Sequence, residues 1–562
     1  MRRAALSRST AFIAGTLLAS SAASAATYTV TRFDDPAPGP CLATSCSLRQ
    51  AIARANSNPG TDRIALPAGT YALTRIDNTP HSLEAGIGAL WVTESVLIYG
   101  AGAGTTRVHW VNAPHQLLEI KNQIIAVDQA AQVSLEIRDL ALSDGRGPSG
   151  GCLNMRGASP KPHLLKLQGA RFEQCQSIGS GGAVHLGLSN VTMRSVVFQE
   201  NSAGSGGALG FVGDATVVSS DVSFIKNAAA QSGGALYIAG SPIPSFVEVL
   251  WSDDGSLRIQ GNNAESGGAI GVFLGTIVLE SAQAAGPGSW IQISGNSAQQ
   301  GGAVHINSLQ PEPIASFTGV RFQRNAASSG GAFHSNSPIQ IRDAEFTGNK
   351  ANAGDGGAVD LVTSFLQSIP STFERVSFRD NVATGGGGAV LSSCGGISAS
   401  NVSFGGNSAG STRGQAIENT GPGELRHATL HSNVHATNPM GSPGLLQLSS
   451  PSCTGVTQMR LANSLITDHC GFSIPRLVSD GGNQYGPNAA VCPANGNDAR
   501  QSNAAVFALA SGSFGGPMEF WGWNATPLVP QRNFALAANC IATDIRGVAR
   551  TDGFCDSGAF EQ

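Results

Sequence analysis

The sequence predicts an all-β chain folded as a right-handed parallel β-helix, a solenoid in which stacked coils build long parallel sheets. Three observations predict this fold. A motif of Phe, Asn and a glycine pair recurs along the chain, its glycine pairs lie 25 to 34 residues apart, and apolar and polar residues roughly alternate between copies. The composition agrees, since 72 of 562 residues are glycine and only 12% are charged.

Residues 1–25 are expected to form a secretory signal peptide. Arg2 and Arg3 precede an apolar stretch at 11–19, and small residues follow at 23–25. The apolar stretch is too short to cross a bilayer, and no later run is long enough to do so, so we expect no transmembrane segment. The protein should therefore be secreted or held at the cell surface of a bacterium.

Residues 26–60 should contain a short helix that caps the N-terminal end of the rod. Ser47 is a good N-cap, with Gln50 three residues later, and Ala51, Ile52 and Ala55 share one helical face. A helix at this point would cover the open edges of the first strands.

Residues 61–440 carry the coils. Typical copies of the motif are FQENSAGSGGAL from Phe198 and FQRNAASSGGAF from Phe322. We expect the Phe side chains to stack inside the rod and the Asn amides to bond from coil to coil in a turn. The glycine pair should form a second corner, where coils approach too closely for a side chain. About twelve coils at roughly 4.8 Å each would give a rod roughly 60 Å long.

Residues 441–562 are expected to hold the last coils and an irregular C-terminal cap with disulfides. The ten cysteines of this exported chain can all pair. Short separations favour three local pairs, which are Cys41 with Cys46, Cys152 with Cys175, and Cys540 with Cys555.

The charge balance excludes one class of partner. The formal net charge is −4, and no stripe of Lys and Arg is present in the sequence. A nucleic-acid-binding protein should carry such a stripe, so we expect no nucleic-acid partner. We expect a monomer.

Three segments resemble known families. Residues 46–74, CSLRQAIARANSNPGTDRIALPAGTYALT, resemble the CSLREA-type N-terminal module of exported bacterial β-helix proteins, with Gln50 in place of the usual Glu. Residues 172–417 resemble the polymorphic outer membrane protein repeat. SDGGNQYG at 479–486 and TDIRGVARTDGFCDSGAFE at 543–561 resemble the closing module of choice-of-anchor surface proteins. These resemblances imply an exported parallel β-helix and leave the chemistry open.

One row of polar residues is the candidate site. Counting from the glycine pairs, the outward position of successive coils holds Tyr237, Gly271, His305, His334 and Asp360. The row could bind a metal ion through His305, His334 and Asp360. Alternatively, Tyr237 or a His could move the proton next to a uronic-acid carboxylate, with the other groups orienting the sugar. Polar residues on an exposed face, aligned by chance, are the third interpretation.

The sequence therefore supports two functions, and a third, a purely structural component of the envelope without a ligand, stays open. The first is an adhesin-like protein that presents an extended face to glycans or surfaces. The second is a polysaccharide lyase or glycoside hydrolase that acts on an acidic polysaccharide in a groove, a lyase being favoured over a hydrolase, with Ca²⁺ as a cofactor if it is a lyase. The sequence lacks the signature motifs of either enzyme class.

Overall fold

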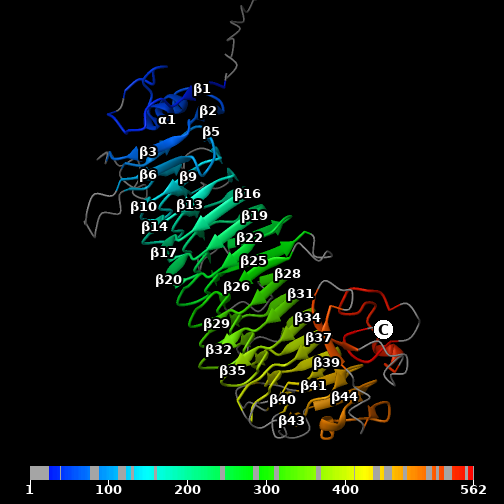
Figure 1. The fold of residues 1–562 in the computed structure, drawn as a ribbon. Helices are drawn as coiled ribbons and strands as arrows, with labels where there is room; N and C mark the ends of the chain where they lie inside the picture. Colours follow the sequence, from blue (N-terminus) through cyan, green and yellow to red (C-terminus); the bar gives the residue numbers. More distant parts are fainter. Residues whose placement is uncertain are drawn as a thin grey trace, which may run out of the picture.

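The computed structural model shows the chain as a rod of stacked coils (Figure 1). It describes residues 25–37, 39–75, 88–111, 122–127, 132–156, 161–240, 247–282, 290–308, 315–362, 369–410, 412–433, 443–448, 453, 458–472, 477–501, 509–513, 518–523, 534–550 and 555–560. The expected signal peptide, up to residue 24, lies outside these residues.

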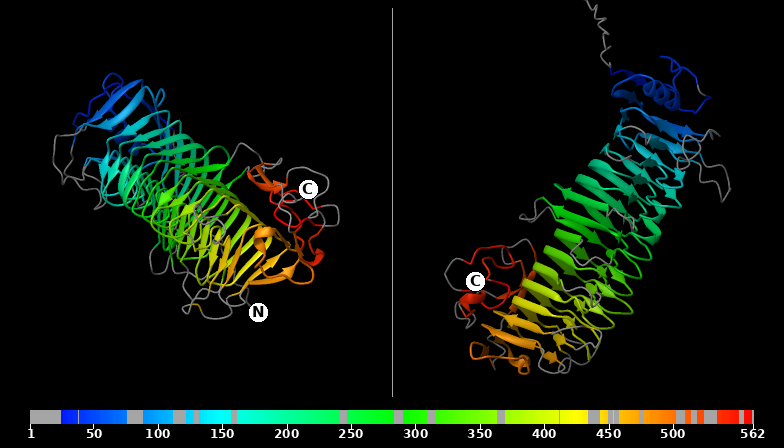
Figure 2. Two further views of the ribbon diagram at one scale, coloured as in Figure 1. Left: turned by 60° about the horizontal axis from the view of Figure 1, so that its bottom comes forward. Right: turned by 180° about the vertical axis from the view of Figure 1, so that it is seen from behind.

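The coils build a right-handed parallel β-helix, as predicted. Figure 2 shows from two further directions that successive coils lie on one another along a single axis. We call its largest sheet, with 25 strands, sheet 1. Sheet 2 has fourteen strands, so the described rod is longer than the twelve coils expected. Short strands at the glycine corner form two small sheets, and β47 and β48 form an antiparallel hairpin.

The strands of sheet 1 are β1 (Thr27–Thr29), β2 (Asp62–Ala65), β3 (Gly69–Leu73), β5 (Val96–Tyr99), β6 (Thr106–Trp110), β8 (Ser134–Arg138), β9 (Ala141–Ser143), β12 (His163–Gln168), β13 (Arg171–Glu173), β16 (Ser189–Gln199), β19 (Ala215–Ile225), β22 (Val247–Asp253), β23 (Arg258–Gln260), β25 (Gly275–Ser281), β26 (Ile291–Ser294), β28 (Ala315–Gln323), β31 (Ile339–Thr347), β34 (Ser371–Arg379), β37 (Ile397–Gly405), β39 (Gly423–His431), β41 (Met459–Ala462), β42 (Leu465–Ile466), β44 (Leu477–Gly481), β45 (Gln484–Tyr485) and β46 (Ala499–Arg500).

The strands of sheet 2 are β4 (Leu90–Val92), β7 (Ile125–Val127), β11 (Leu153–Met155), β15 (Val184–Leu186), β18 (Leu209–Phe211), β21 (Leu236–Ala239), β24 (Ile270–Phe273), β27 (Val304–Asn307), β30 (Phe333–Ser335), β33 (Val359–Leu361), β36 (Val390–Ser392), β38 (Ile417–Asn419), β40 (Leu445–Gln447) and β43 (Cys470–Phe472). The remaining strands are β10 (Arg146–Gly147), β14 (Gln176–Ser177), β17 (Ser202–Ser205), β20 (Ala228–Ser232), β29 (Ala326–Ala327), β32 (Lys350–Ala351), β35 (Val382–Ala383), β47 (Leu509–Gly512) and β48 (Phe520–Trp523).

The predicted helix α1 (Leu48–Asn56) caps the N-terminal end of the rod (Figure 1). Ser47 and Gln50 form a capping box, in which the Gln50 backbone N–H donates to Ser47 Oγ and the Ser47 backbone N–H donates to Gln50 Oε1. The apolar face is buried, and Asn56 Nδ2 donates to the Trp91 carbonyl at 2.7 Å. The helix is thus fastened to the first strand of sheet 2.

The motif phenylalanines stack inside the rod, as predicted. Phe172, Phe198 and Phe224 lie face to face with ring centroids 4.8 to 5.0 Å apart. A second stack, with centroids 4.7 to 4.9 Å apart, contains Phe322, Phe346, Phe378 and Phe404. Ile259 and Ile293 take the same position between the two stacks, and all these side chains are buried.

The motif asparagines form a buried ladder along the whole repeat. At Asn325, for example, Oδ1 accepts from the backbone N–H and Nδ2 of Asn296, each at 3.0 Å. Its Nδ2 donates to Asn349 Oδ1 and to the Ile293 carbonyl, again at 3.0 Å. The same pattern links Asn201, Asn227, Asn262, Asn296, Asn325, Asn349, Asn381, Asn407 and Asn433. The ladder satisfies backbone groups that a buried turn would otherwise leave unpaired.

The glycine pair forms the second corner. Gly206 has φ +64°, a left-handed conformation that favours glycine. A Cβ atom on Gly207 would lie 2.2 Å from the Gly234 carbonyl oxygen of the next coil. The first glycine is thus required by backbone conformation and the second by the approach of coils.

Single non-glycine residues in the left-handed conformation bend the long strands of sheet 1. Asp343, Arg375 and Asn401 occupy this position in β31, β34 and β37, with φ between 50° and 53°. Because the strands are in register, the bends stack and their side chains meet. Arg375 Nε and Nη2 donate to the two carboxylate oxygens of Asp343 at 2.6 and 2.8 Å.

The last described residues, from β48 to residue 560, which we call the C-terminal segment, lie against the flank of the rod (Figures 1 and 2). Strand β48 contacts β34, β37 and β39 of sheet 1. Ser377 Oγ donates to the Glu519 carbonyl at 2.6 Å, and Thr429 Oγ1 accepts from the Ala559 backbone N–H at 3.0 Å. The outward side chains of sheet 1 supply these bonds, which explains the lateral position.

All ten cysteines are paired. The structure joins Cys41 to Cys46, Cys152 to Cys175 and Cys540 to Cys555, the three pairs favoured from the sequence. Two further disulfides join Cys394 to Cys453 and Cys470 to Cys492.

Replacing one asparagine of the ladder should destabilise the rod strongly. Asn325→Ala removes four buried hydrogen bonds and takes away the acceptor of the buried Asn296 backbone N–H, which should cost roughly 2 to 4 kcal/mol. Denaturant unfolding measures this cost. The control is Asn263→Ala, which removes an exposed contact to Ser297 on the same side of the coil. Equal losses in the two variants would contradict a stabilising ladder.

The last residue of the ladder should give the fold a pH dependence. Asp468 accepts from Asn433 in place of a further Asn, and burial raises the pKa of this carboxyl group to about 7. An unfolded Asp titrates near about 3.9, so this stabilisation is complete below about pH 4 and is lost as the pH rises through about 7. Asp468→Asn should therefore raise the unfolding temperature at about pH 8 but not at about pH 4. The same shift at both pH values would contradict this assignment.

Candidate functional site

Strand pairing places the predicted row of polar residues side by side on successive coils. In sheet 2, Tyr237 of β21 pairs with Gly271 of β24, and Gly271 pairs with His305 of β27. His305 then pairs with His334 of β30, and His334 with Asp360 of β33. We call these five residues the imidazole row.

Three members of the imidazole row are in contact. The rings of His305 and His334 stack with centroids 5.3 Å apart and an interplanar angle of 11°. His334 Nδ1 lies 3.0 Å from Asp360 Oδ2. This hydrogen bond leaves His334 Nε2 for another partner. Tyr237 lies two coils away from His305, beyond Gly271, so the structure does not bring its side chain into this cluster.

The row is less exposed than an outward position suggests. His305 and Asp360 are 8% and 4% exposed, and the His334 side chain is 12% exposed. Burial, together with the neighbouring His334, lowers the pKa of His305 to about 4. Burial raises the pKa of Asp360, against the opposing effect of its bond to His334. His305 is therefore a neutral imidazole near pH 7.

The polar atoms of the row are only partly paired. His305 Nδ1 and Asp360 Oδ1 have no hydrogen-bond partner among the residues that the structure describes. The metal role predicted for His305, His334 and Asp360 needs three ligand atoms around one point. Among the described residues, the one group of three such atoms within 4.8 Å is His427 with Cys540 and Cys555, whose thiols form a disulfide. The row as arranged thus favours proton transfer over metal binding.

Further polar residues extend the row in both directions. His185 precedes it, and its Nδ1 lies 2.8 Å from Ser180 Oγ. Glu418 follows Asp360 and Leu391, and forms a salt bridge with Arg413 at 2.6 Å. Glu418 was not predicted from the sequence, although it lies four residues after Gly414, as His334 lies four residues after Gly330.

A second candidate site is a groove on sheet 1. It has a volume of about 440 Å³ and crosses five strands, β25, β28, β31, β34 and β37. Its lining is mainly polar and consists of Glu280, Ser316, Thr318, Gln340, Ile341, Arg342, Thr372, Phe373, Glu374, Ser398 and Ser400. The polar residues form two registered rows, Glu280, Thr318, Arg342, Glu374 and Ser400 in one, and Ser316, Gln340, Thr372 and Ser398 in the other.

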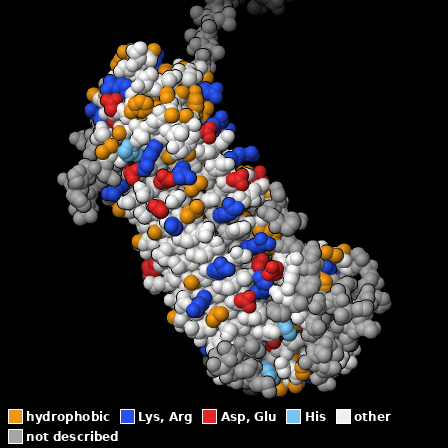
Figure 3. Space-filling view, viewed as in Figure 1, with side chains coloured by type: hydrophobic (Ala, Val, Ile, Leu, Met, Phe, Trp, Pro, Cys, Tyr) orange, Lys and Arg blue, Asp and Glu red, His pale blue; other side chains and the backbone are white. Residues whose placement is uncertain are grey.

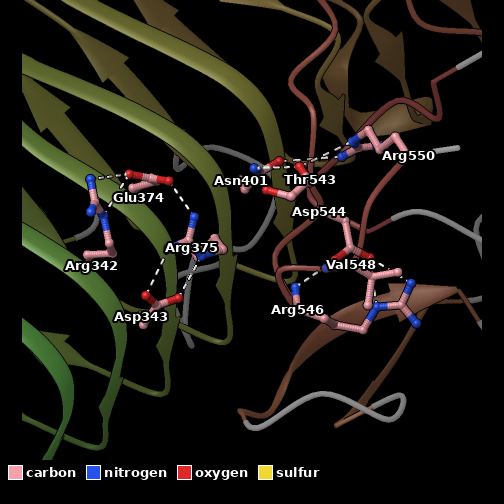
Figure 4. Close-up of polar contacts among 10 residues, drawn as sticks. All are labelled: Arg342, Asp343, Glu374, Arg375, Asn401, Thr543, Asp544, Arg546, Val548 and Arg550. Atoms are coloured by element: carbon pink, nitrogen blue, oxygen red, sulfur yellow. Dashed lines mark hydrogen bonds and ion pairs between the residues drawn. The ribbon is translucent and has the colours of Figure 1, made fainter. Parts of the chain in front are cut away.

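A chain of ion pairs lies beside and within this groove (Figure 4). Arg342 Nε donates to Glu374 Oε2 at 2.8 Å, and the other carboxylate oxygen of Glu374 accepts from Arg375 Nη1. Arg375 is in turn held by both oxygens of Asp343, the bend residue of the preceding coil. The guanidinium groups are therefore fixed by carboxylates of this chain.

The C-terminal segment adjoins the far end of the groove. Ser400 lines the groove, and the next residue, Asn401, donates from Nδ2 to the Thr543 carbonyl at 2.8 Å (Figure 4). Arg550 Nη2 donates to Asn401 Oδ1 at 3.4 Å. The segment thus lies beside the groove, at the bend and on the other side of it, and contacts β34 and β37, which also line the groove. The groove was not found from the sequence, although its polar residues alternate with apolar ones along each strand.

The charged side chains are of both signs on the face seen in Figure 3, where they are scattered among uncharged ones. This pattern differs from the basic stripe that a nucleic-acid partner would require.

The comparisons with known proteins agree with the repeat. The model of the Chlamydia polymorphic membrane protein (Chlamydia_PMP) repeat matches residues 221–239 and 375–393. Both segments contain the Phe, Asn and glycine-pair motif. The matched residues do not include 46–74 or the C-terminal motifs, so those two resemblances stay predictions. No curated protein matches the chain.

Two solved structures are similar in fold. One is a tailspike protein mutant of E. coli bacteriophage HK620 in complex with a pentasaccharide, with 14% identity, a TM-score of 0.36, and coverage of 80% of this chain and 77% of that chain. The other is the A-module of the Azotobacter vinelandii mannuronan C-5 epimerase AlgE4, with 14% identity, a TM-score of 0.31, and coverage of 84% and 100%. At these values the likeness does not extend to chemistry.

The disulfides indicate the cellular compartment in which the protein folds. Five of them are typical of a protein outside the cytoplasm, and the matched repeat is by name that of a membrane protein. Within the described part of the chain, no helix is long and apolar enough to cross a membrane.

Proposed function

We propose that the protein is an exported, adhesin-like glycan-binding protein that holds an extended sugar chain in the groove of sheet 1. The observation that carries this proposal is the lining of the groove. Five successive strands present hydroxyl, amide and charged groups in two rows, and most of these side chains are partly or fully exposed. Steps of roughly 4.8 Å give the row of five residues a length of about 19 Å and the row of four residues a length of about 14 Å.

The regular spacing suits a polymer better than a single small ligand. Each coil repeats similar hydrogen-bonding groups at the same height, so a chain of sugar units along the axis would meet similar partners at each step. The groove has few apolar atoms of the kind that form the core of a protein interface. Its volume of about 440 Å³ and its extended shape therefore favour an oligosaccharide segment.

The proposal predicts binding that depends on the uncharged groove residues. Gln340 and Thr372 are neighbours in one row, and neither belongs to the ion-pair chain. The double variant Gln340→Ala, Thr372→Ala should weaken glycan binding by about 10-fold or more, because about 1.4 kcal/mol of hydrogen bonding corresponds to that factor. A glycan array identifies the ligand and calorimetric titration measures the affinity.

The matched control is the double variant Asn190→Ala, Thr216→Ala. These exposed residues occupy the same row on earlier coils, outside the groove. The control should bind as the wild type does, within about 2-fold. Equal losses in both double variants, or no binding of any glycan by the wild type, would contradict the proposal.

A second function is favoured by the bond between His334 and Asp360. A carboxylate that holds Nδ1 orients an imidazole so that Nε2 can accept a proton. In a uronic-acid polymer, this base would remove the proton next to the carboxylate, and the leaving sugar would depart with formation of a double bond. Ca²⁺ could neutralise the sugar carboxylate in such a reaction, while Tyr237 and His305 would orient the sugar.

The lyase alternative is tested by incubating the protein with uronic-acid polymers, with and without calcium. Absorbance reports new unsaturated ends, and a reducing-end assay reports hydrolysis. His334→Ala should lower any activity by at least about 100-fold, the range of general-base catalysis. His185→Ala, in the same row on an earlier coil, should keep it. Full activity of His334→Ala, or no activity of the wild type in either assay, would exclude the imidazole row as a catalytic site.

A further inference from the structure

The charge balance of the groove on sheet 1 indicates which glycans it accepts. We propose that the groove selects sugar segments without carboxylate or sulfate groups, and this inference rests on the proposed glycan binding. The residues that carry it are the two arginines and three carboxylates of the groove and its adjacent bend.

Both guanidinium groups already have carboxylate partners. Arg342 is bound by Glu374 at 2.8 Å, and Arg375 is bound by both oxygens of Asp343 at 2.6 and 2.8 Å and also by Glu374. Hydrogen bonding to Asp343 raises the pKa of Arg375, so this residue stays charged within the network. Arg375 is thus bound through all three of its nitrogens, and the Nε–Nη2 edge of Arg342 is occupied by Glu374, which leaves only the Nη1–Nη2 edge of Arg342 for the two-pronged contact with which arginine recognises an acidic group.

One carboxylate of the groove is unpaired. Glu280 lies at the N-terminal end of the row that continues with Thr318 and Arg342, and its exposed side chain forms no ion pair with a described residue. Together with Glu374 and Asp343, it gives three carboxylates against the two guanidinium groups. The groove therefore carries a net negative charge, which repels a uronate or a sulfated sugar.

The remaining polar groups suit uncharged sugars. Ser316, Thr318, Thr372, Ser398 and Ser400 offer hydroxyl groups, and Gln340 offers an amide. Each can donate to and accept from a sugar hydroxyl without a change of charge. A neutral segment would thus gain hydrogen bonds along both rows and would itself carry no charge for the groove to repel.

The test compares matched neutral and acidic oligosaccharides on the full chain. Cello-, laminari-, xylo-, galacto- and manno-oligosaccharides are the neutral probes, and oligogalacturonate and oligoalginate are the acidic ones. The wild type should bind at least one neutral probe about 10-fold or more tightly than any acidic probe. This neutral binding should change by less than about 2-fold between low and high salt, because it neutralises no charge.

The variant Glu374→Gln reverses the preference if the inference holds. It removes the carboxylate shared by the two arginines and frees Arg342, so affinity for acidic probes should rise by about 10-fold or more. Glu173→Gln is the control, since Glu173 pairs with Arg171 at 2.9 Å on β13, a strand of sheet 1 that does not line the groove. The control should not gain affinity for acidic probes.

The outcomes separate this inference from the proposed function. The inference would be overturned if the wild type bound acidic probes more tightly than neutral ones and the double variant Gln340→Ala, Thr372→Ala abolished that binding. The groove would then still be a glycan-binding site. Unchanged acidic binding by a folded Glu374→Gln protein would also overturn the inference. Failure of every probe, neutral and acidic, would overturn the proposed function itself.

Discussion

Register between coils is the constraint on which the rest of the structure depends. The asparagine ladder enforces it, because each amide bonds the next coil at one height and also satisfies buried backbone groups. With register fixed, Phe lies on Phe inside the rod, and every outward residue lies beside its counterpart on the next coil. Single substitutions in such a fold thus act through their neighbours above and below.

The same register creates the candidate sites. On sheet 2 it brings His305, His334 and Asp360 together, three residues that share no local sequence. On sheet 1 it produces the two rows of the groove, and one step beyond the bend it presents Ser377 and Thr429 to the C-terminal segment. One face of the sheet therefore serves two purposes, a solvated groove on one side of the bend and an intramolecular docking surface on the other.

Features that recur at a fixed position in each coil could be predicted from the sequence. The Phe and Asn positions, the glycine corner, the capping helix from Ser47 and the alignment of His305 with His334 and Asp360 all follow from counting. The low exposure of this row could not be predicted by counting, because it depends on the three-dimensional surroundings of the row. The bend in sheet 1 was not predicted, because the residues at this position, Asp343, Arg375 and Asn401, differ from coil to coil and none is glycine. The flank position of the C-terminal segment rests on contacts such as Ser377 with Glu519, which are remote in sequence and have no pattern to reveal them.

The central claim is that the groove of sheet 1 binds a glycan along the rod axis. A crystal structure of the full chain with the tightest neutral oligosaccharide tests it most directly. The account predicts successive sugar rings over β28, β31 and β34, with hydrogen bonds to Gln340 and Thr372 and no contact with the imidazole row. A sugar bound at His334 on sheet 2, or across the coils and not along them, would contradict the account.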